Sequence, residues 1–259
     1  MAVFISVVSH GHSSIIQELN CLNKLCEDFI VVIKSNKTGD DFRDLANSDN
    51  VYWIDEAYGM GFGKNNNLVF SFCQKKLEMK EEDFFVIFNP DVDMEASELS
   101  KLLRLMDNEK SKVSAINLYK DKQQKEYDNS IRTFPSLIQF AKSFLGFGND
   151  SSLDKSKISE STEVDWAAGS FLAFTADHYR SLGGFDESYF MYCEDIDICF
   201  RSKRAGESVV YYPQVKASHL AKHSSRNLFS KHFYWHVTSV LRFMFLKAGL
   251  TKLRTSLSQ

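Results

Sequence analysis

The chain has 259 residues, of which 44% are hydrophobic, 25% charged and 14% aromatic, with only three prolines and a formal net charge of -3. This balance is that of a packed globular protein and excludes collagen-like, low-complexity and disordered chains. The sequence has no apolar run of 18 residues, no basic leader and no paired cysteine spacing, so it predicts neither a membrane span, nor a secretory signal, nor a structural zinc site.

The first 120 residues alternate short apolar runs with helical patterns, which predicts βαβ units around a mainly parallel sheet. Ligands of such sheets bind beyond the carboxyl ends of the strands, so His10, Ser35, Asn36 and the segment Asn89 to Asp93 should converge. The expected strands are Val3–Val8, Phe29–Ile33, Val51–Ile54, Phe84–Phe88 and Val113–Leu118, and the expected helices are Ser13–Cys26, Asp40–Ala46, Asn65–Lys76 and Ala96–Asn108.

The middle of the chain is different in character. Residues 120–163 are polar and irregular, which is typical of a connecting segment. Regular structure is expected again as a strand at Val164–Phe174, a helix at Glu194–Ala205 and a strand at Ser208–Tyr212.

Positive charge is concentrated at the carboxyl end of the chain. None of the 34 acidic residues follows Glu207, whereas eight of the 31 basic residues do: Lys216, Lys222, Arg226, Lys231, Arg242, Lys247, Lys252 and Arg254. Apolar residues recur there at helical spacing, so residues 226–259 are predicted to form a basic amphipathic tail that suits an anionic membrane surface. A helix that packs on the domain and exposes its basic side is an equal alternative. No nucleic-acid recognition motif occurs, and no nucleic-acid partner is expected.

Two short motifs suit a donor with phosphate groups. Asp91 and Asp93 follow the strongest apolar run, and carboxylates at a strand exit can hold Mg²⁺ or Mn²⁺ together with substrate phosphates. Alternatively, Pro90 breaks the strand and Asp93 caps the next helix. Gly61 and Gly63 open a helix, where phosphate can approach the backbone, although a tight loop explains them equally well.

Two further motifs lie in the second half of the chain. Glu194, Asp195 and Asp197 begin a helix. Spacing puts Glu194, Asp197 and Arg201 on neighbouring faces, so an ion pair with Arg201 could hold these two acids and leave Asp195 to point elsewhere. The alternative is an acidic first turn that favours the helix dipole. His219 and His223 are four residues apart, a spacing that suits a metal pair or phosphate ligands.

The order of the motifs resembles that of the family-two inverting glycosyltransferases, and in particular their rhamnosyltransferase branch. The resemblance covers residues 3 to 245 and is most specific between Gly183 and Asp197. The motifs that carry it are Val7-Val-Ser-His-Gly11, Ser35-Asn36, Gly61-Phe-Gly63, Asn89-Pro-Asp91, Trp166-Ala-Ala-Gly-Ser170, Gly183-Gly-Phe-Asp-Glu187, Phe190-Met-Tyr-Cys-Glu-Asp-Ile-Asp197 and His219.

The resemblance implies a GT-A fold over residues 1–225, with a nucleotide-binding half at about 1–120 and an acceptor half at about 121–225. It implies an enzyme that transfers a sugar, L-rhamnose from dTDP-rhamnose, to a polyprenyl-diphosphate-linked acceptor in O-antigen or other surface polysaccharide synthesis. Such an enzyme would act in the cytoplasm, on the inner face of the cell membrane. The alternatives are a non-catalytic sugar-nucleotide or polyanion-binding module and a nucleotidyl-transfer enzyme.

The resemblance also assigns roles to single residues. Asp195 matches the general base, and Asp91 with His219 would hold Mg²⁺ or Mn²⁺. Asn89 stands where the family has the first carboxylate of its metal motif, and Ser35 stands where it usually has an acid that contacts the base. The implied nucleotide-binding residues are Ser35, Asn36, Gly61, Gly63, Asn66, Asn67 and Asp91; the acceptor side is implied at Trp166, Ala168, Gly169 and Glu194, with Arg201 as structural support.

Overall fold

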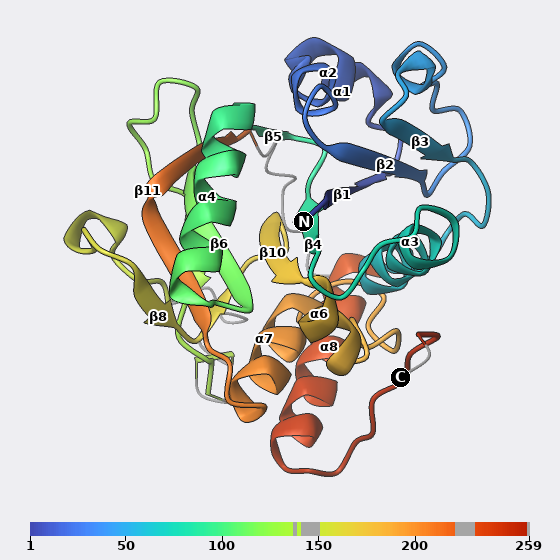
Figure 1. Ribbon diagram of the computed structural model, residues 1–259. Coiled ribbons are helices and arrows are strands. Elements are labelled where there is room, and N and C mark those ends of the chain that lie inside the picture. Colours follow the sequence, from blue (N-terminus) through green and yellow to red (C-terminus); the bar gives the residue numbers. More distant parts are fainter. Residues whose placement is uncertain (137–138, 141–150, 221–230, 258–259) are drawn as a thin grey trace.

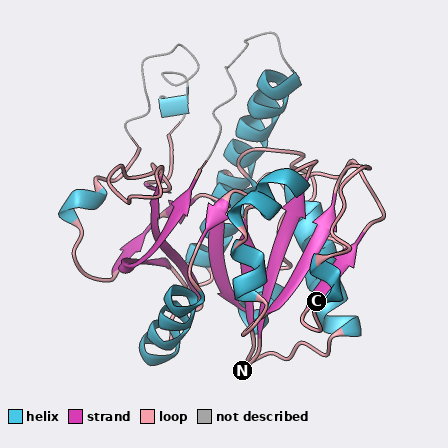
Figure 2. Cartoon of the chain, turned by 90° about the horizontal axis from the view of Figure 1, so that it is seen from above, coloured by secondary structure: helices cyan, strands magenta, loops and turns pink. Residues whose placement is uncertain are grey.

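One sheet organises the molecule, with helices on both of its faces (Figures 1 and 2). The computed structural model describes residues 1–136, 139–140, 151–220 and 231–257. Within them, nine strands pair in the order β3-β2-β1-β4-β10-β6-β11-β5, with β8 also on β11, while β7 and β9 form a separate pair.

The strands are β1 (Val3–Ser9), β2 (Ile30–Ser35), β3 (Val51–Ile54), β4 (Phe84–Phe88), β5 (Val92–Asp93), β6 (Val113–Tyr119), β7 (Ile131–Arg132), β8 (Thr162–Val164), β9 (Trp166–Ala167), β10 (Phe171–Thr175) and β11 (Val209–His219). The helices are α1 (Ser13–Leu19), α2 (Cys21–Leu25), α3 (Phe62–Lys76), α4 (Ala96–Glu109), α6 (Ala176–Ser181), α7 (Glu194–Arg204) and α8 (Lys231–Lys247), with 3-10 turns at Leu45–Asn47 and Lys155–Lys157.

The first half of the sheet is parallel, as predicted. β1 pairs in parallel with β2 on one side and with β4 on the other, and β2 pairs in parallel with β3. These strands are runs of Val, Ile and Phe because helices cover both faces of the sheet.

The second half changes direction at β10. This strand is antiparallel to both β4 and β6, so β4 and β6 run the same way, and β11 is parallel to β6. As a result β1, β2, β4, β6 and β11 all end at the same edge of the sheet. Loops that carry polar side chains leave the sheet at this edge.

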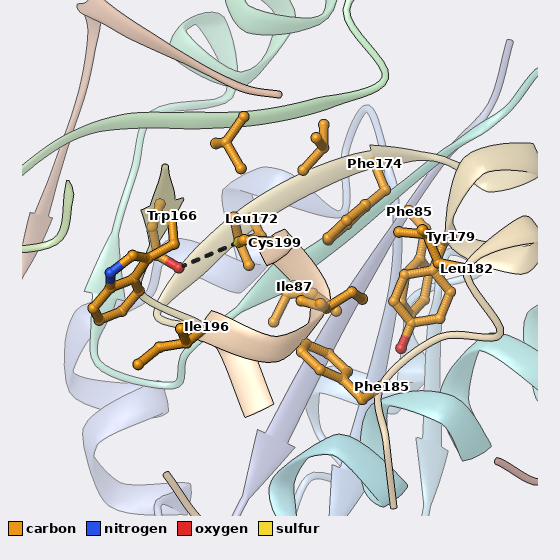
Figure 3. Packing of buried hydrophobic residues seen from close by; sticks show 14 of the residues in the cluster. Phe85, Ile87, Trp166, Leu172, Phe174, Tyr179, Leu182, Phe185, Ile196 and Cys199 are labelled. Atoms are coloured by element: carbon orange, nitrogen blue, oxygen red, sulfur yellow. Dashed lines mark hydrogen bonds between the residues drawn. The ribbon is translucent and has the colours of Figure 1, made fainter. Parts of the chain in front are cut away.

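Alternate residues of each strand enter opposite layers of the core. In β4, Phe85 and Ile87 face α3, α6 and α7, whereas Phe84 and Val86 face the side of α1, α2 and α4. Figure 3 shows the first layer, in which Tyr179 is surrounded by aromatic rings. The ring centres of Phe85 and Phe70 lie 4.9 and 4.7 Å from that of Tyr179. This rigid layer supports α7, which begins at the candidate site.

Several predicted elements have other boundaries. The expected helix Ser13–Cys26 is divided at Asn20, whose φ of 53° ends α1. The expected helix Asp40–Ala46 is wrong, since only a 3-10 turn at Leu45–Asn47 forms there and Asp40 instead accepts backbone hydrogen bonds from the start of α1. The expected strand Val164–Phe174 is interrupted, and the structure has β8, β9 and β10 in this region.

The predicted tail helix is present as α8, and it is anchored on the domain. Val240, Phe243 and Leu246 are buried, and Arg242 forms an ion pair with Asp186, which is almost fully buried. The next residues return along the domain, where Leu257 is buried. Lys222 and Arg226 of the basic stretch, and His223 of the predicted histidine pair, lie outside the described residues. No described helix is both long and apolar enough to cross a membrane.

Candidate active site

A cavity of about 830 Å³ opens at the edge where the parallel strands end. His10 and His12 after β1, Asn36 after β2, Asn89 to Asp91 after β4 and His219 at the end of β11 all line it. The predicted convergence of strand ends therefore occurs, except at Ser35, Val92 and Asp93, which do not line the cavity. Trp166, Ala168, Gly169, Glu194 and Asp195 line the same cavity from the second half of the chain.

On one side of the cavity, strand pairing brings His219 to Asp91. β5 pairs antiparallel with the end of β11, so that His219 is the partner of Val92, and the N–H of Leu220 donates to the carbonyl of Asp91. The imidazole Nε2 of His219 lies 3.4 Å from Oδ1 of Asp91, while its Nδ1 lies 2.6 Å from Oδ2 of Asp128. Asp93 points elsewhere, toward Lys122.

The two carboxylates control the charge of His219. Burial opposes protonation of the imidazole, but the hydrogen bonds to Asp128 and Asp91 outweigh it and raise the pKa of His219 to about 9. Burial likewise opposes ionisation of Asp91 and Asp128, yet the contact with His219 leaves the pKa of each carboxyl below its usual value. The protein alone therefore holds an imidazolium between two carboxylates.

On another side of the cavity, backbone hydrogen bonds fix Asp195. The N–H groups of Gly169 and Ile196 donate to Oδ2 and Oδ1 of Asp195 at 3.1 and 2.9 Å. Tyr192 and Cys193, just before α7, both have left-handed backbone, with φ of 73° and 64°. A pair of such residues costs energy and persists only where the surroundings enforce it, often at functional sites.

Glu194 adjoins Asp195 and is buried. Burial, reinforced by the charge of Asp195, raises the pKa of Glu194 to about 8, and burial also raises the pKa of Asp195. Among the described residues, Oε2 of Glu194 has no hydrogen-bond partner. Burial therefore favours the protonated form of Glu194 at neutral pH and makes the carboxylate of Asp195 more basic.

Arg201 lies one turn after Asp197 in α7. Its Nε donates to Oδ1 of the buried Asp197 at 2.7 Å, and its other nitrogens donate to the carbonyls of Leu182 and Gly184. The two hydrogen bonds to carbonyls join α7 to the turn that precedes the site, and the ion pair of Arg201 involves Asp197 alone among the three acids.

Several residues predicted to bind the nucleotide do not line the cavity. Ser35 is buried and accepts a hydrogen bond from the indole of Trp53. Gly61 and Gly63 allow close packing, because a Cβ at Gly61 would lie 2.6 Å from the carbonyl oxygen of Phe190 and one at Gly63 would lie 2.6 Å from Cβ of Phe185.

Asn66 and Asn67 have structural contacts as well. Asn66 accepts a hydrogen bond from the hydroxyl of Ser6, and Asn67 accepts one from the hydroxyl of Tyr179 and donates to the carbonyl of Phe185. Asn36, in contrast, lines the cavity and exchanges two hydrogen bonds with the backbone of Met60.

Four further residues that line the cavity were not predicted as site residues. Asp128 and Arg132 come from the irregular segment, and the guanidinium of Arg132 lies 5.5 Å from the centre of the Trp166 ring. Asn65 is fully buried, and within the described residues its Oδ1 has no partner. Trp235 comes from α8, which the sequence assigned to the tail.

Comparison with known sequences gives likenesses to sugar-transferring enzymes. The chain is 34% identical over 252 residues to rhamnosyltransferase WbbL of Escherichia coli (strain K12). The aligned region covers 96% of this chain and 95% of that protein. It is 37% identical over 81 residues to the N-acetylglucosaminyl-diphospho-decaprenol L-rhamnosyltransferase of Mycobacterium tuberculosis (strain CDC 1551 / Oshkosh), covering 31% of this chain and 26% of that protein. No protein-family model matches the chain.

Comparison with solved structures gives a likeness of fold. The crystal structure of S. aureus TarS 1-349 in complex with UDP matches with a TM-score of 0.59 at 15% identity, over 98% of this chain and 67% of that one. A longer TarS structure gives the same TM-score, and there the chain covers 41% of the matched structure.

A change at Glu194 tests the protonation of the acidic pair. In the unfolded chain Glu194 has its usual pKa of 4.5, whereas in the folded protein the pKa of Glu194 is raised to about 8. The folded state thus binds more protons in this pH range, and stability decreases as pH rises from 4.5 to 8. Glu194→Gln removes this loss, so the variant should be more stable than wild type at pH 8, by on the order of a few kcal/mol.

Urea unfolding between pH 5 and pH 8 measures the effect, and the difference from wild type should shrink toward pH 5. Glu18→Gln, in an exposed turn of α1, is the control and should follow wild type throughout. A constant difference across this range would mean that Glu194 is ionised in the folded protein.

Proposed function

Because the chain belongs to the rhamnosyltransferase family and has the GT-A fold of the TarS structures, it is a glycosyltransferase, and we propose that it transfers L-rhamnose from dTDP-rhamnose to a sugar on a polyprenyl diphosphate. The names of the two rhamnosyltransferases support the sugar, and that of the mycobacterial enzyme supports an acceptor on a lipid diphosphate. The observation that carries the mechanism is the single cavity that holds both the Asp91 and His219 pair and Asp195.

In this proposal Asp195 acts as the general base of an inverting transfer. The acceptor hydroxyl gives its proton to the carboxylate while its oxygen attacks the anomeric carbon, and the bond from that carbon to the donor diphosphate breaks on the opposite face. The two backbone N–H groups fix the orientation of the carboxylate. The protonated Glu194 beside it avoids a second negative charge in the same place.

Asp91 and His219 would stabilise the leaving diphosphate. The part of the chain that the structure describes holds no group of three or more His, Cys, Asp or Glu side chains suited to a metal. One carboxylate and one imidazole nevertheless fit Mg²⁺ or Mn²⁺, since such ions take few protein ligands and complete their coordination with substrate phosphates. When bound, the ion would neutralise charge on the diphosphate. Asp128, which accepts from Nδ1 of His219, would orient Nε2 toward the ion.

We also propose that the outer side of α8 and the residues after it contact an anionic membrane. Leu241, Phe245 and Leu250 are between 50% and 72% exposed, which leaves an apolar strip outside the domain. Lys231 and Lys247, at the two ends of α8, and Lys252 and Arg254, after it, are exposed as well. Each basic residue near an anionic leaflet contributes about 1 kcal/mol. Arg242, Phe243 and Trp235 do not belong to this surface, because they are paired, buried or directed to the cavity.

The role of Asp195 is tested by Asp195→Asn. Turnover should fall by about 10² to 10⁴ because the amide cannot take the proton, while donor binding stays nearly intact. Release of nucleoside diphosphate from dTDP-rhamnose with a lipid-linked acceptor is the measurement. Asp107→Asn, on the outer end of α4, is the control. Near wild-type turnover would exclude Asp195 as the base, and release of inorganic diphosphate would indicate nucleotidyl transfer instead.

The metal proposal is tested by Asp91→Ala and Asp128→Asn. The first should abolish the strengthening of donor binding by Mn²⁺, and the second should weaken Mn²⁺ affinity by about 10- to 100-fold, because His219 loses its orienting partner. Electron paramagnetic resonance of Mn²⁺ in the presence of nucleoside diphosphate measures both. Asp93→Ala is the matched control two residues away. If a chelator changes neither donor binding nor turnover, His219 acts on the diphosphate directly as an imidazolium.

The membrane proposal is tested by replacing Lys231, Lys247, Lys252 and Arg254 with Gln. The variant should lose sedimentation with anionic liposomes at low salt and should lose more activity on a lipid-linked acceptor than on a short soluble analogue. Replacing Lys64, Lys75, Lys76 and Lys80 with Gln removes the same charge from the region of α3. This control should change neither the sedimentation with liposomes nor the relative activity on the two acceptors. Equal binding of wild type to neutral and anionic liposomes would contradict the proposal.

A further inference from the structure

The first turns of α8 form part of the cavity. His232, Trp235 and His236 lie at i, i+3 and i+4 and therefore share one face of the helix, and all three line the cavity. The same side of α8 continues toward its carboxyl end as the buried face, formed by Ser239, Val240, Phe243 and Leu246. The helix thus contributes ring side chains to the site as well as anchoring itself on the domain.

These rings meet two others from the loop before α7. The ring centres of Trp235 and Phe190 lie 4.5 Å apart, with 35° between their planes. The hydroxyl of Tyr192 lies 3.1 Å from Nδ1 of His232, and its ring centre lies 5.1 Å from that of His236. We call these five residues, Phe190, Tyr192, His232, Trp235 and His236, the aromatic wall.

The loop that carries Phe190 and Tyr192 is held from two directions. The N–H of Phe62 donates to the carbonyl of Phe190 at 3.0 Å, and the hydroxyl of Ser239 in α8 donates to the carbonyl of Met191 at 2.9 Å. The close approach of Gly61 leaves no room for a Cβ beside this loop. These contacts hold the loop in which Tyr192 has its left-handed backbone.

The wall is incompletely covered although it is rich in rings. Phe190 and Tyr192 are 38% and 36% exposed, and both border the cavity rather than the outer surface alone. Rings held in fixed positions with open faces and hydrogen-bonding edges are typical of a ligand site. The rings offer apolar faces, and the imidazoles with the phenol hydroxyl offer donors and acceptors.

We propose that the aromatic wall binds the sugar ring of the acceptor. A pyranose presents C–H groups on its faces, which pack on aromatic rings, and hydroxyls around its edge, which suit Tyr192, His232 and His236. Tyr192 of the wall is three residues before Asp195 in the chain, so a sugar stacked on the wall brings a hydroxyl toward the base. The donor nucleotide belongs at the strand ends near His10 and Asn36. This assignment rests on the proposed function for the identity of the acceptor as a saccharide.

Equilibrium binding tests the wall separately from turnover. The probe is N-acetylglucosaminyl diphosphate with a short alkyl tail, titrated calorimetrically into the Asp195→Asn enzyme in the presence of nucleoside diphosphate. Adding Trp235→Ala or His232→Ala to this enzyme should weaken probe binding by about tenfold or more, as expected for a lost ring contact of about 1.4 kcal/mol. The dissociation constant of the nucleotide should stay the same.

Tyr234→Ala is the matched control, since Tyr234 is the neighbouring ring on α8, is 67% exposed and does not line the cavity. His232→Ala, at an exposed position, keeps the test open if Trp235→Ala does not fold. Equal probe binding by all variants, or a loss of nucleotide binding instead, would overturn the proposal. If wild type binds the probe through the wall but transfers no sugar to lipid-linked acceptor, the proposed function fails and the wall stands.

Discussion

The direction of β10 is the constraint on which the rest of the molecule depends. Because β10 is antiparallel to both of its neighbours, β4 and β6 run in the same direction and the two halves of the chain share one sheet. The carboxyl ends of five strands then open at one edge, and the loops after them must meet there. If β10 were antiparallel to β4 alone, β6 would run the other way, the loop after β6 would leave from the other edge of the sheet, and Asp128 could not reach His219.

Two local constraints then place the chemistry within this frame. The short pairing of β5 with β11 sets Asp91 beside His219, and the strained turn at Tyr192 and Cys193 sets Asp195 at the start of α7. Neither depends on the other, so each side of the site can be disturbed separately. What joins them is the sheet itself, whose aromatic core layer lies under α7 (Figure 3).

Much of this architecture could be predicted from local sequence. The five expected strands of the first half all form, because continuous apolar runs between polar segments have few other solutions in a packed sheet. The contacts of Gly61 could not be predicted, since a glycine before a helix suits a phosphate and a crowded loop equally well, and only the position of Phe190 decides between them. Asp128 and Trp235 were missed for a related reason: each reaches the cavity through pairing or packing with a residue far away in the chain.

The position of α8 connects recognition of the acceptor with its location. The inner face of this helix lines the cavity in its first turns and is buried on the domain farther along, while the exposed Leu241 and Phe245 lie on the opposite face. A lipid-linked acceptor has the same division, with a sugar that must reach the base and a chain that must stay in the membrane. A single rigid helix that contacts both the sugar and the membrane would fix the distance between the bilayer and the reacting hydroxyl. The acceptor would then already be positioned when the donor reacts.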